Sequence, residues 1–411
     1  MYALAIDLGT TTLAASLIDR RSGVRLAISG ALNPQRRFGA DVISRLDAAV
    51  NSATLQQEMT ALIRAELRRI GAELCARAGI AWGEVGSVAI AGNPAMQHVL
   101  LGLDLNSLAF LPYRPLYRAG TKLKAADLEW EGSANIYVFP MPGGFVGGDT
   151  VAFLYGAEPD EGTLCLDMGT NGEIALLAGE TVWATSAAAG PAFEGGNLSC
   201  GMAALPGAIS SVQVEGERLK LQVIGNGRPC GICGSAAIET IAELLRCNVL
   251  EAGGRLRSQL EIESNLAARV IEYQGGSAFV LYRDAGRLIV LTQDDIRQLQ
   301  LAKAAIRAGI DVLVEHSRIH CHALKQVLLT GSFGAVMRVE WLKTLGFFDE
   351  SMIQTTRFTP EGALAGVEKA LVNGDDFSGV EELAHRFRVV PLSGTPLFET
   401  LFMKHIDFPP T

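Results

Sequence analysis

One short pattern occurs twice in this 411-residue chain and constrains its fold more than any other feature. Residues 6–12 read IDLGTTT and residues 166–172 read LDMGTNG, so each copy places Asp, any residue, Gly and Thr after an apolar run. Apolar runs also follow both turns, which predicts a buried strand, a tight turn and a second strand. A chain that repeats this hairpin is expected to contain two related halves.

Each hairpin is followed by segments in which strand and helix patterns alternate. Residues 55–74 carry apolar side chains at steps of three and four, which predicts one face of a helix. Residues 147–157 predict a helix that opens on glycine, and residues 234–246 predict one in the second half. Residues 292–316 predict a long helix that begins with a Thr-to-Asp capping spacing. This order predicts an α/β chain.

A polar run, AEPDEG at residues 157–162, separates the halves and predicts domains at 1–160 and 161–411. Residues 104–134 and 247–286 show no clear periodicity of apolar residues, so we expect these segments to be irregular or inserted. Residues 247–286 would be an inserted segment of the second domain.

Both turns have the composition of a phosphate-binding site. A tight turn around glycine exposes backbone N–H groups, and neighbouring hydroxyl groups add donors, so a phosphate can approach without steric conflict. The predicted phosphate-binding residues are Gly9, Thr10, Thr11 and Thr12 in the first turn and Gly169, Thr170, Asn171 and Gly172 in the second. Either turn taken alone is more typical of an ordinary hairpin with a polar tip, and it is the two copies together with a third glycine-rich turn at 331–334 that favour a phosphate site.

The aspartate of each turn predicts a metal ion. A carboxylate repels a phosphate unless a cation lies between them, and Mg²⁺ takes one or two carboxylates while keeping most of its waters. Asp7 and Asp167 are therefore predicted catalytic residues and Mg²⁺ ligands beside a bound polyphosphate.

Two further segments complete the predicted site. LLTGSFGA ends a strand in a glycine-rich turn that suits close approach of a nucleoside. Its predicted contact residues are Gly331, Ser332, Phe333 and Gly334. GGFVGGDTVAFLYG places Asp149 at the start of a helix, where it is either a base that activates a hydroxyl or water, or only an N-cap.

Two phosphate hairpins and one adenosine turn resemble the nucleotide site of the acetate and sugar kinase, heat-shock cognate and actin superfamily. The resemblance implies two RNase-H-like, actin-like ATPase domains with ATP and Mg²⁺ in the interdomain cleft. In the sugar kinases of this superfamily, the aspartate that matches Asp149 is the general base for the acceptor hydroxyl.

Longer runs narrow the resemblance. They are ALNPQRRFGADVISRL (31–46), PAFEGGNLSCGM (191–202), LPGAISSV (205–212), GICGSAAIETIAELL (231–245) and LTQDDIRQLQLAKAAIRAGIDVL (291–313), with LFETLFMKHIDFP near the end. These runs look like the ATPase domain of reductive activators of corrinoid-dependent enzymes. The resemblance implies an ATPase that helps to reduce Co(II) to Co(I) on a corrinoid protein or corrinoid-dependent methyltransferase, and a homodimer is possible.

Family members usually carry an iron–sulfur domain ahead of the ATPase region. Here the sequence starts at the first hairpin and contains no four-cysteine cluster signature. We therefore expect a separate ferredoxin-like protein to donate the electron, unless the chain performs only the ATP-driven conformational step.

Several residues have two interpretations. Cys230 and Cys233 suit either an iron–sulfur cluster shared across a homodimer or, as we favour, a tight loop of small residues. Histidines at 316, 320 and 322 suit a metal pair or, preferably, a solvated helix end. Arg36 and Arg37 suit phosphates, a partner or surface ion pairs, and Glu194 suits a position near ribose or metal.

Composition excludes other classes of protein. The net charge is −9, so a nucleic-acid partner bound through a basic face is not expected. No apolar run reaches the roughly 20 residues of a membrane span, and the seven scattered cysteines predict no disulfide framework, so we expect a cytoplasmic protein. A small-molecule kinase and a non-catalytic, nucleotide-gated binding module remain the alternative functions.

Overall fold

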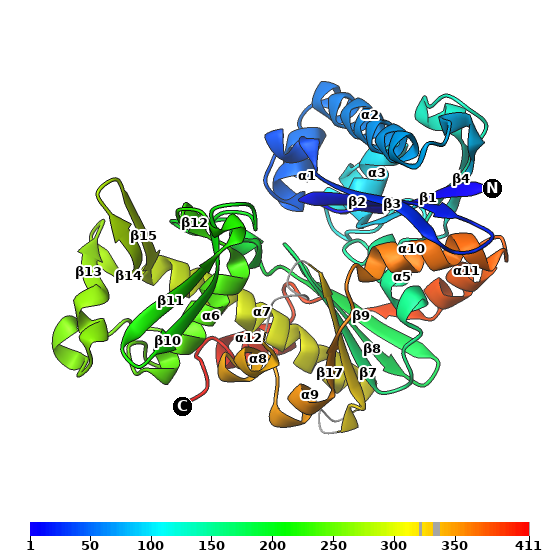
Figure 1. Cartoon of the computed structure of the whole chain (residues 1–411). Coiled ribbons are helices and arrows are strands. Elements are labelled where there is room, and N and C mark those ends of the chain that lie inside the picture. The colour runs from blue at the N-terminus through cyan, green and yellow to red at the C-terminus, as the bar shows by residue number, and fades with distance from the viewer. Residues whose placement is uncertain (320–322, 332–337, 411) are drawn as a thin grey trace. The chain divides into compact units, whose positions relative to one another are not determined.

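The computed structural model describes residues 1–319, 323–331 and 338–410 and has an α/β architecture, as predicted (Figure 1). Residues cluster into two compact units. Unit 1 comprises Met1–Glu161, Leu177–Thr185 and Glu361–Val390, and unit 2 comprises Gly162–Leu176, Ser186–Pro360 and Pro391–Thr411. The chain therefore enters unit 1 three times, and the first half of the sequence makes up most of it.

Unit 1 is built on a six-stranded mixed sheet with the order β3-β2-β1-β4-β6-β5. Its strands are β1 (Tyr2–Leu8), β2 (Thr12–Asp19), β3 (Arg25–Leu32), β4 (Val85–Gly92), β5 (Thr121–Lys124) and β6 (Asn135–Val138). The hairpin of β1 and β2 is antiparallel, whereas β1, β4 and β6 run parallel. The carboxyl ends of β1 and β4 therefore meet at one edge, which is where the first Asp-Gly-Thr turn lies.

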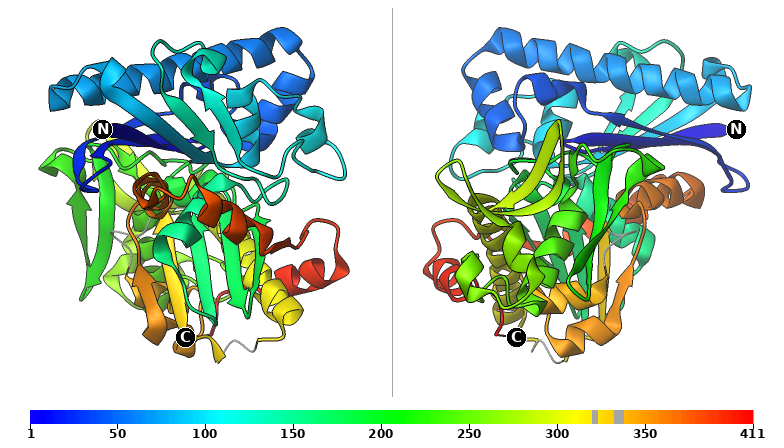
Figure 2. Two further views of the ribbon diagram at one scale, coloured as in Figure 1. Left: turned by 90° about the vertical axis from the view of Figure 1, so that its right-hand side faces the viewer. Right: turned by 60° about the vertical axis from the view of Figure 1, so that its left-hand side comes forward.

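Helices cover both faces of this sheet (Figure 1). One face packs against α2 (Ala53–Ala78), with α1 (Val42–Val50) and α3 (Pro94–Leu101) beside it. Figure 2 shows α2 running along the sheet in both views. The helix matches the predicted periodicity because its buried side chains, including Ile63 and Leu67, recur at steps of three and four.

The opposite face packs against α5 (Gly148–Ala157) and α10 (Gly362–Asn373), with α11 (Ser378–His385) beyond them. The two helices approach closely because a Cβ at Gly366 would lie 1.7 Å from the carbonyl oxygen of Ala152. Glu368 of α10 also accepts hydrogen bonds from Ser16 of β2 and Arg25 of β3. A late segment of the chain thus completes unit 1. Residues 181–185 of β9 (Thr181–Ala187), which pairs in parallel with β18 (Phe387–Val389), also fall in unit 1, as does β18.

Unit 2 contains the second Asp-Gly-Thr hairpin. Its strands β7 (Thr163–Met168) and β8 (Gly172–Ala178) are antiparallel, and β16 (Gln326–Gly331) runs parallel to β7 with β17 (Thr356–Phe358) outside it. The flanking helices are α6 (Gly234–Arg246) and the long α7 (Gln293–Ser317), whose N-cap Thr292 forms the predicted capping box with Asp295.

Two further sheets of unit 2 were not foreseen. One consists of β10 (Ala208–Glu215), β11 (Arg218–Val223) and β12 (Gly231–Ile232). The other consists of β13 (Val270–Tyr273), β14 (Gly276–Asp284) and β15 (Arg287–Thr292). The expectation of irregular structure at 247–286 is therefore wrong for β13 and β14, and that for 104–134 is wrong for β5.

The remaining helices are short: α4 (Asn106–Ala109), α8 (Val339–Thr344), α9 (Glu350–Thr355) and α12 (Pro396–Lys404). Short 3-10 turns include η1 (Pro34–Arg37) and η4 (Pro191–Glu194). Within the described ranges, no helix combines the length and apolarity needed to cross a bilayer.

Candidate nucleotide site

The first turn is held tightly at the edge of the unit 1 sheet. Asp7 lies one residue before the end of β1, opposite Ala14 of β2 and beside Ala91 of β4. A Cβ at Gly9 would lie 2.4 Å from the carbonyl oxygen of Thr12, so only glycine fits this turn. Thr11 is partly exposed, and Thr12, at the end of the turn, is exposed.

Two asparagines that the sequence analysis did not single out hold this turn. Asn33 donates from its side chain to the carbonyl oxygen of Gly9 at 2.9 Å, and its backbone N–H donates to Thr11. Asn93 donates from Nδ2 to Oγ1 of Thr10 at 2.8 Å while its own Oδ1 caps α3 through Met96. Because Oγ1 of Thr10 accepts this bond, its hydroxyl proton can be donated to a ligand. Asn93 follows the buried strand β4, whereas the strand before Asn33 has no buried residue, so no local sequence signal marks the two positions.

Asp149 lies at the same edge of the unit 1 sheet. It is the second residue of α5, whose N-cap is Gly147, so the interpretation of Asp149 as an N-cap is wrong. A Cβ at Gly147 would lie 2.4 Å from the carbonyl oxygen of Gly92, which ends β4. This contact brings the start of α5 against the strand end next to Leu8.

The environment of Asp149 suits a proton acceptor. Its side chain is partly buried, and this burial raises the pKa of the carboxyl group to about 6, against the opposing effect of hydrogen bonds from Thr150. A carboxylate with this pKa is charged at neutral pH and is a stronger base than an exposed aspartate.

The second turn has its own set of polar contacts in unit 2. Asp167 lies one residue before the end of β7 and directly opposite Glu173 of β8. Oγ1 of Thr170 donates to Oε2 of Glu194 at 2.6 Å, which places the η4 turn against the hairpin. Within the turn, the N–H of Gly169 donates to the carbonyl oxygen of Asn171 at 3.0 Å. Glu194 is thus a neighbour of the predicted phosphate turn.

The third predicted segment meets the second hairpin at Gly331. This residue ends β16 with φ of 96°, and a Cβ on it would lie 2.5 Å from Oδ1 of Asp167. Glycine is required there by both conformation and space. The other predicted contact residues of this turn, Ser332, Phe333 and Gly334, lie outside the described residues.

The pairing of Asp167 with Glu173 fits a bound cation. A divalent ion near this end of the hairpin would be attracted by both carboxylates, of which Glu173 also accepts from the hydroxyl of Ser186. In the described ranges, no group of three or more His, Cys, Asp or Glu side chains is placed to hold a metal. Mg²⁺ bound mainly by phosphate oxygens and water needs only one or two carboxylates, so the residues present fit it.

Other candidate residues have separate partners. Cys233 is the buried N-cap of α6 and lies 3.2 Å from the hydroxyl of Ser235, whereas Cys230 is exposed and accepts from Arg287 at 2.8 Å. Arg37 forms an ion pair with Glu58 on the surface, as one interpretation held. Of the three histidines, those at 320 and 322 lie outside the described residues.

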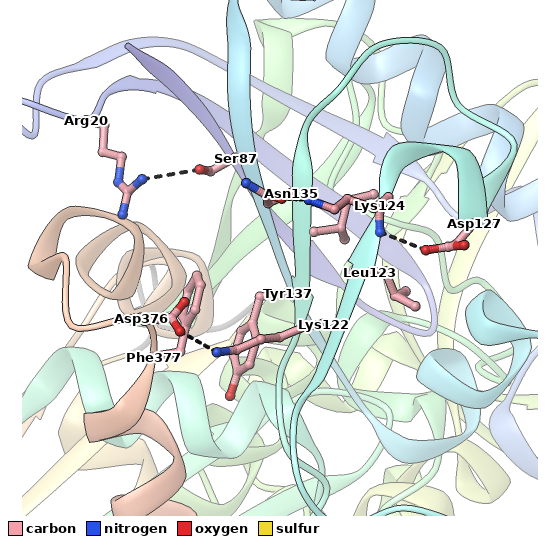
Figure 3. A pocket seen from close by; sticks show the side chains of 11 residues that line it. Arg20, Ser87, Lys122, Leu123, Lys124, Asp127, Asn135, Tyr137, Asp376 and Phe377 are labelled. Atoms are coloured by element: carbon pink, nitrogen blue, oxygen red, sulfur yellow. Dashed lines mark hydrogen bonds and ion pairs between the residues drawn. The ribbon is translucent and has the colours of Figure 1, made fainter.

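A pocket of about 420 Å³ lies at the opposite end of the unit 1 sheet (Figure 3). Ser87 of β4 and its neighbour Asn135 of β6 line the pocket. Ser87 precedes Gly92, at the carboxyl end of β4, by five residues, which corresponds to roughly 16 Å along the strand. Its cations have partners, since Lys122 is paired with Asp376 and Arg20 donates to Ser87. The pocket is therefore separate from the first phosphate turn.

Comparisons with known proteins agree with this architecture. A family model described as the C-terminal domain of RACo, the ASKHA domain, matches residues 161–411, and one described as the RACo middle region matches residues 2–161. The actin-like ATPase fold predicted from the sequence is confirmed by the first of these models.

The chain is 30% identical to the corrinoid activation enzyme RamQ of Eubacterium limosum, over 99% of this chain and 70% of RamQ. It is 26% identical to the Co(II) methylated amine-specific corrinoid protein reductase of Methanosarcina barkeri, over 84% of this chain and 65% of that relative. A solved structure of a reductive activator for corrinoid, iron-sulfur protein matches with a TM-score of 0.88 and 30% identity, over 100% of this chain and 66% of that one.

The chain thus spans about two thirds of the length of these relatives. The two family models together match residues 2–411, and the resemblance to reductive activators drawn from the sequence is confirmed. This chain belongs to the RACo family of corrinoid activators, of which it contains the middle region and the ASKHA domain.

Proposed function

We propose that this chain binds ATP with Mg²⁺ and hydrolyses the nucleotide in order to reactivate a corrinoid protein or corrinoid-dependent methyltransferase. The observation that carries the proposal is the match, over the whole chain, to a reductive activator, combined with two Asp-Gly-Thr turns, of which the first is built around the sterically required Gly9 and the second lies against the sterically required Gly331. In the proposed reaction, the corrinoid cobalt is reduced by one electron from Co(II) to Co(I). A separate ferredoxin-like iron–sulfur protein is the proposed electron donor.

The roles of the residues follow from their chemistry. Gly9 and the threonines after it, with the matching turn at 169–172, would contact phosphate oxygens through N–H and hydroxyl groups. Asp7 and Asp167 would hold Mg²⁺, which neutralises phosphate charge during hydrolysis. Asp149 would orient the attacking water and accept its proton, consistent with its raised pKa.

Hydrolysis is proposed to drive activation through conformational coupling. If the ATP-bound and ADP-bound forms differ in affinity for the corrinoid protein, each turnover binds and releases the partner. In unit 2, Gly331 of β16 lies against Asp167, and in unit 1, Asn33 and Asn93 hold the first turn. Nucleotide binding can act on each unit through these contacts.

The decisive experiment combines two readouts. Purified protein is incubated with ATP, Mg²⁺, a reducing ferredoxin and a Co(II)-loaded corrinoid protein, and phosphate release and the Co(I) absorption band are followed together. We expect both signals in the wild type and neither in Asp7→Asn or Asp167→Asn. Phosphate transfer to a small metabolite without Co(I) formation would instead establish the kinase alternative, and nucleotide binding without turnover would establish the binding module.

A further inference from the structure

A basic and apolar segment of unit 1 is not used by the nucleotide site. Residues 105–126 contain four cationic side chains and no carboxylate, although the whole chain has 44 acidic and 35 basic residues. The segment includes the 110–118 loop, FLPYRPLYR, between α4 and β5. Positive charge is therefore concentrated on one stretch of an acidic protein.

The apolar side chains of this loop face solvent. The exposed fraction is 80% for Leu111, 59% for Phe110, 57% for Tyr117 and 47% for Leu116. Arg114, between these residues, and Arg118, directly after Tyr117, are also exposed. A cluster of exposed apolar groups with interspersed arginines is typical of a protein-binding surface, because aromatic side chains and arginine dominate the energetics of such contacts.

The backbone of the loop is nevertheless fixed. Arg114 donates its N–H to the carbonyl oxygen of Ser107 at 2.8 Å, and Leu116 donates its N–H to Nε2 of His98 at 3.3 Å. Pro115 is buried between these two points. The loop therefore presents its apolar side chains from a preformed backbone, which lowers the entropy lost on binding.

The loop also packs against the segment that carries Asp149. A Cβ at Gly144 would lie 1.8 Å from the carbonyl oxygen of Tyr113, and the rings of Tyr113 and Phe145 are 5.4 Å apart. Met141 donates its N–H to the carbonyl oxygen of Arg118 at 3.0 Å. A displacement of the loop would therefore reach residues 141–147, which lead directly into the helix of Asp149.

A second connection runs to the first phosphate turn. His98 of α3 holds Leu116, and its Nδ1 donates to the carbonyl oxygen of Asp104 at 3.1 Å. The N-cap of the same helix is Asn93, which donates to Thr10. The loop is thus connected through one buried helix to a residue predicted to contact phosphate.

From these contacts we infer that the 110–118 loop is the surface on which the corrinoid protein docks, and that docking acts on Asp149 through residues 141–147. The inference rests on the proposed function. This docking requires a partner surface that is apolar with a rim of carboxylates, because those groups complement the exposed apolar side chains and Arg114 and Arg118. Lys122 and Lys124 line the pocket of Figure 3 just after the loop, but Lys122 is paired with Asp376 and Lys124 donates to Asn135, so the charge offered to a partner is that of Arg114 and Arg118.

The test measures binding to a panel of Co(II)-loaded corrinoid proteins, including a methylated amine-specific one. Two loop variants are compared with wild type: Leu111→Ser with Tyr117→Ser, and Arg114→Glu with Arg118→Glu. Their matched controls are Leu260→Ser, at a side chain that is 99% exposed elsewhere, and Arg21→Glu, also exposed. MgATP affinity and the melting temperature are measured in every variant.

We expect both loop variants to lose at least about tenfold in partner affinity, with MgATP affinity and melting temperature unchanged, and the controls to behave as wild type. Equal partner binding by wild type and loop variants overturns the docking surface and leaves the proposed function standing. A wild-type chain that binds MgATP but no corrinoid protein overturns both. Self-association lost only in the loop variants shows that the occupant is a second copy, which also overturns the inference.

Coupling to Asp149 needs a separate variant. Gly144→Ala pushes against the carbonyl oxygen of Tyr113, so we expect partner stimulation of ATP hydrolysis to fall severalfold while unstimulated hydrolysis persists. Gly143→Ala, whose added methyl lies nearest to side-chain atoms of Val389 and not to a backbone atom, is the control. Full stimulation in a folded Gly144→Ala protein overturns the coupling, and a Gly144→Ala protein that fails to bind the partner supports docking through this loop.

Discussion

Gly331 closes over the carboxylate of Asp167, with only 2.5 Å between the position of a Cβ at residue 331 and Oδ1 of the aspartate. The end of β16 and the second phosphate turn are therefore built as one unit. Because β16 runs parallel to β7 in this register, Asp167 has Thr330 as its direct neighbour and Gly331 just beyond. The absence of a side chain at 331 leaves the space that the carboxylate occupies.

Replacing Gly331 with alanine is expected to weaken MgATP binding by at least about tenfold, since the methyl group displaces Asp167. The left-handed backbone, with φ of 96°, adds a loss of about 1 kcal/mol in folding stability. Isothermal titration and chemical denaturation measure the two effects.

Gly179→Ala provides the matched control for this strain. Gly179 also has a positive φ, 58°, but nothing lies within 4 Å of an added Cβ. It should lose comparable stability and bind MgATP as wild type does. Wild-type affinity in Gly331→Ala would show that the contact with Asp167 does not matter for nucleotide binding.

The hydrogen bond from Asn93 to Thr10 can be separated from the helix cap that Asn93 also provides. Asn93→Ser retains a capping oxygen but is too short to reach Thr10, whereas Asn93→Ala loses both functions. We expect both variants to lose MgATP affinity to the same extent, and only Asn93→Ala to lose a further ~1 kcal/mol of stability. Unequal affinities would place the effect in α3 and not in the turn.

Asp149 predicts the pH dependence of hydrolysis. Burial raises the pKa of its carboxyl group to about 6, so the carboxylate needed as a base is lost as the pH falls through 6. We expect ATP hydrolysis to fall tenfold per pH unit below this value in wild type. Asp149→Asn should retain MgATP binding and have a low rate without this inflection.

The same group has an opposite effect on stability. Because the pKa is raised in the folded state, the folded chain binds more protons than the unfolded chain between about pH 4 and 6, and stability falls as pH rises through that window. Asp149→Asn should therefore be more stable than wild type at pH 7 and lose this advantage near pH 4. Denaturation curves at both pH values test the sign.

His98 predicts an acid-sensitive anchor for the 110–118 loop. Nε2 accepts from Leu116 only when neutral, and burial lowers the pKa of the imidazole below its ordinary value. Below about pH 6.5 the unfolded chain therefore binds a proton that the folded chain does not. As the pH is lowered, the free energy of unfolding decreases by at most about 1.4 kcal/mol per pH unit.

Comparison with His98→Gln isolates this contribution, because glutamine can still accept from Leu116 but does not titrate. We expect the stability difference between the two proteins to change between pH 7.5 and 5, with wild type losing more. Parallel curves would mean that His98 does not titrate differently in the folded and unfolded chains.

The sequence predicted local structure correctly where a residue pattern is compatible with only one conformation. Glycine after Asp in both turns and the apolar spacing of α2 each predicted a local structure that is observed. It was insufficient where tertiary contacts decide. Strand β11 alternates between exposed and partly buried residues and has no apolar run, so only its pairing with β10 makes it a strand. The asparagines that hold the first turn come from positions 24 and 84 residues beyond Gly9, and nothing local to either reveals the contact.

The return of Glu361–Val390 to unit 1 has a practical consequence for dissecting the protein. A fragment ending at residue 161, where the two family models meet, would keep α5 but lack α10, so the part of the buried sheet face that α10 covers would lie in water. Expression of that fragment should yield aggregates, whereas joining residues 1–161 through a short linker to 361–390 would restore the missing layer. The regions matched by the two family models are thus not the same as the compact units of this chain.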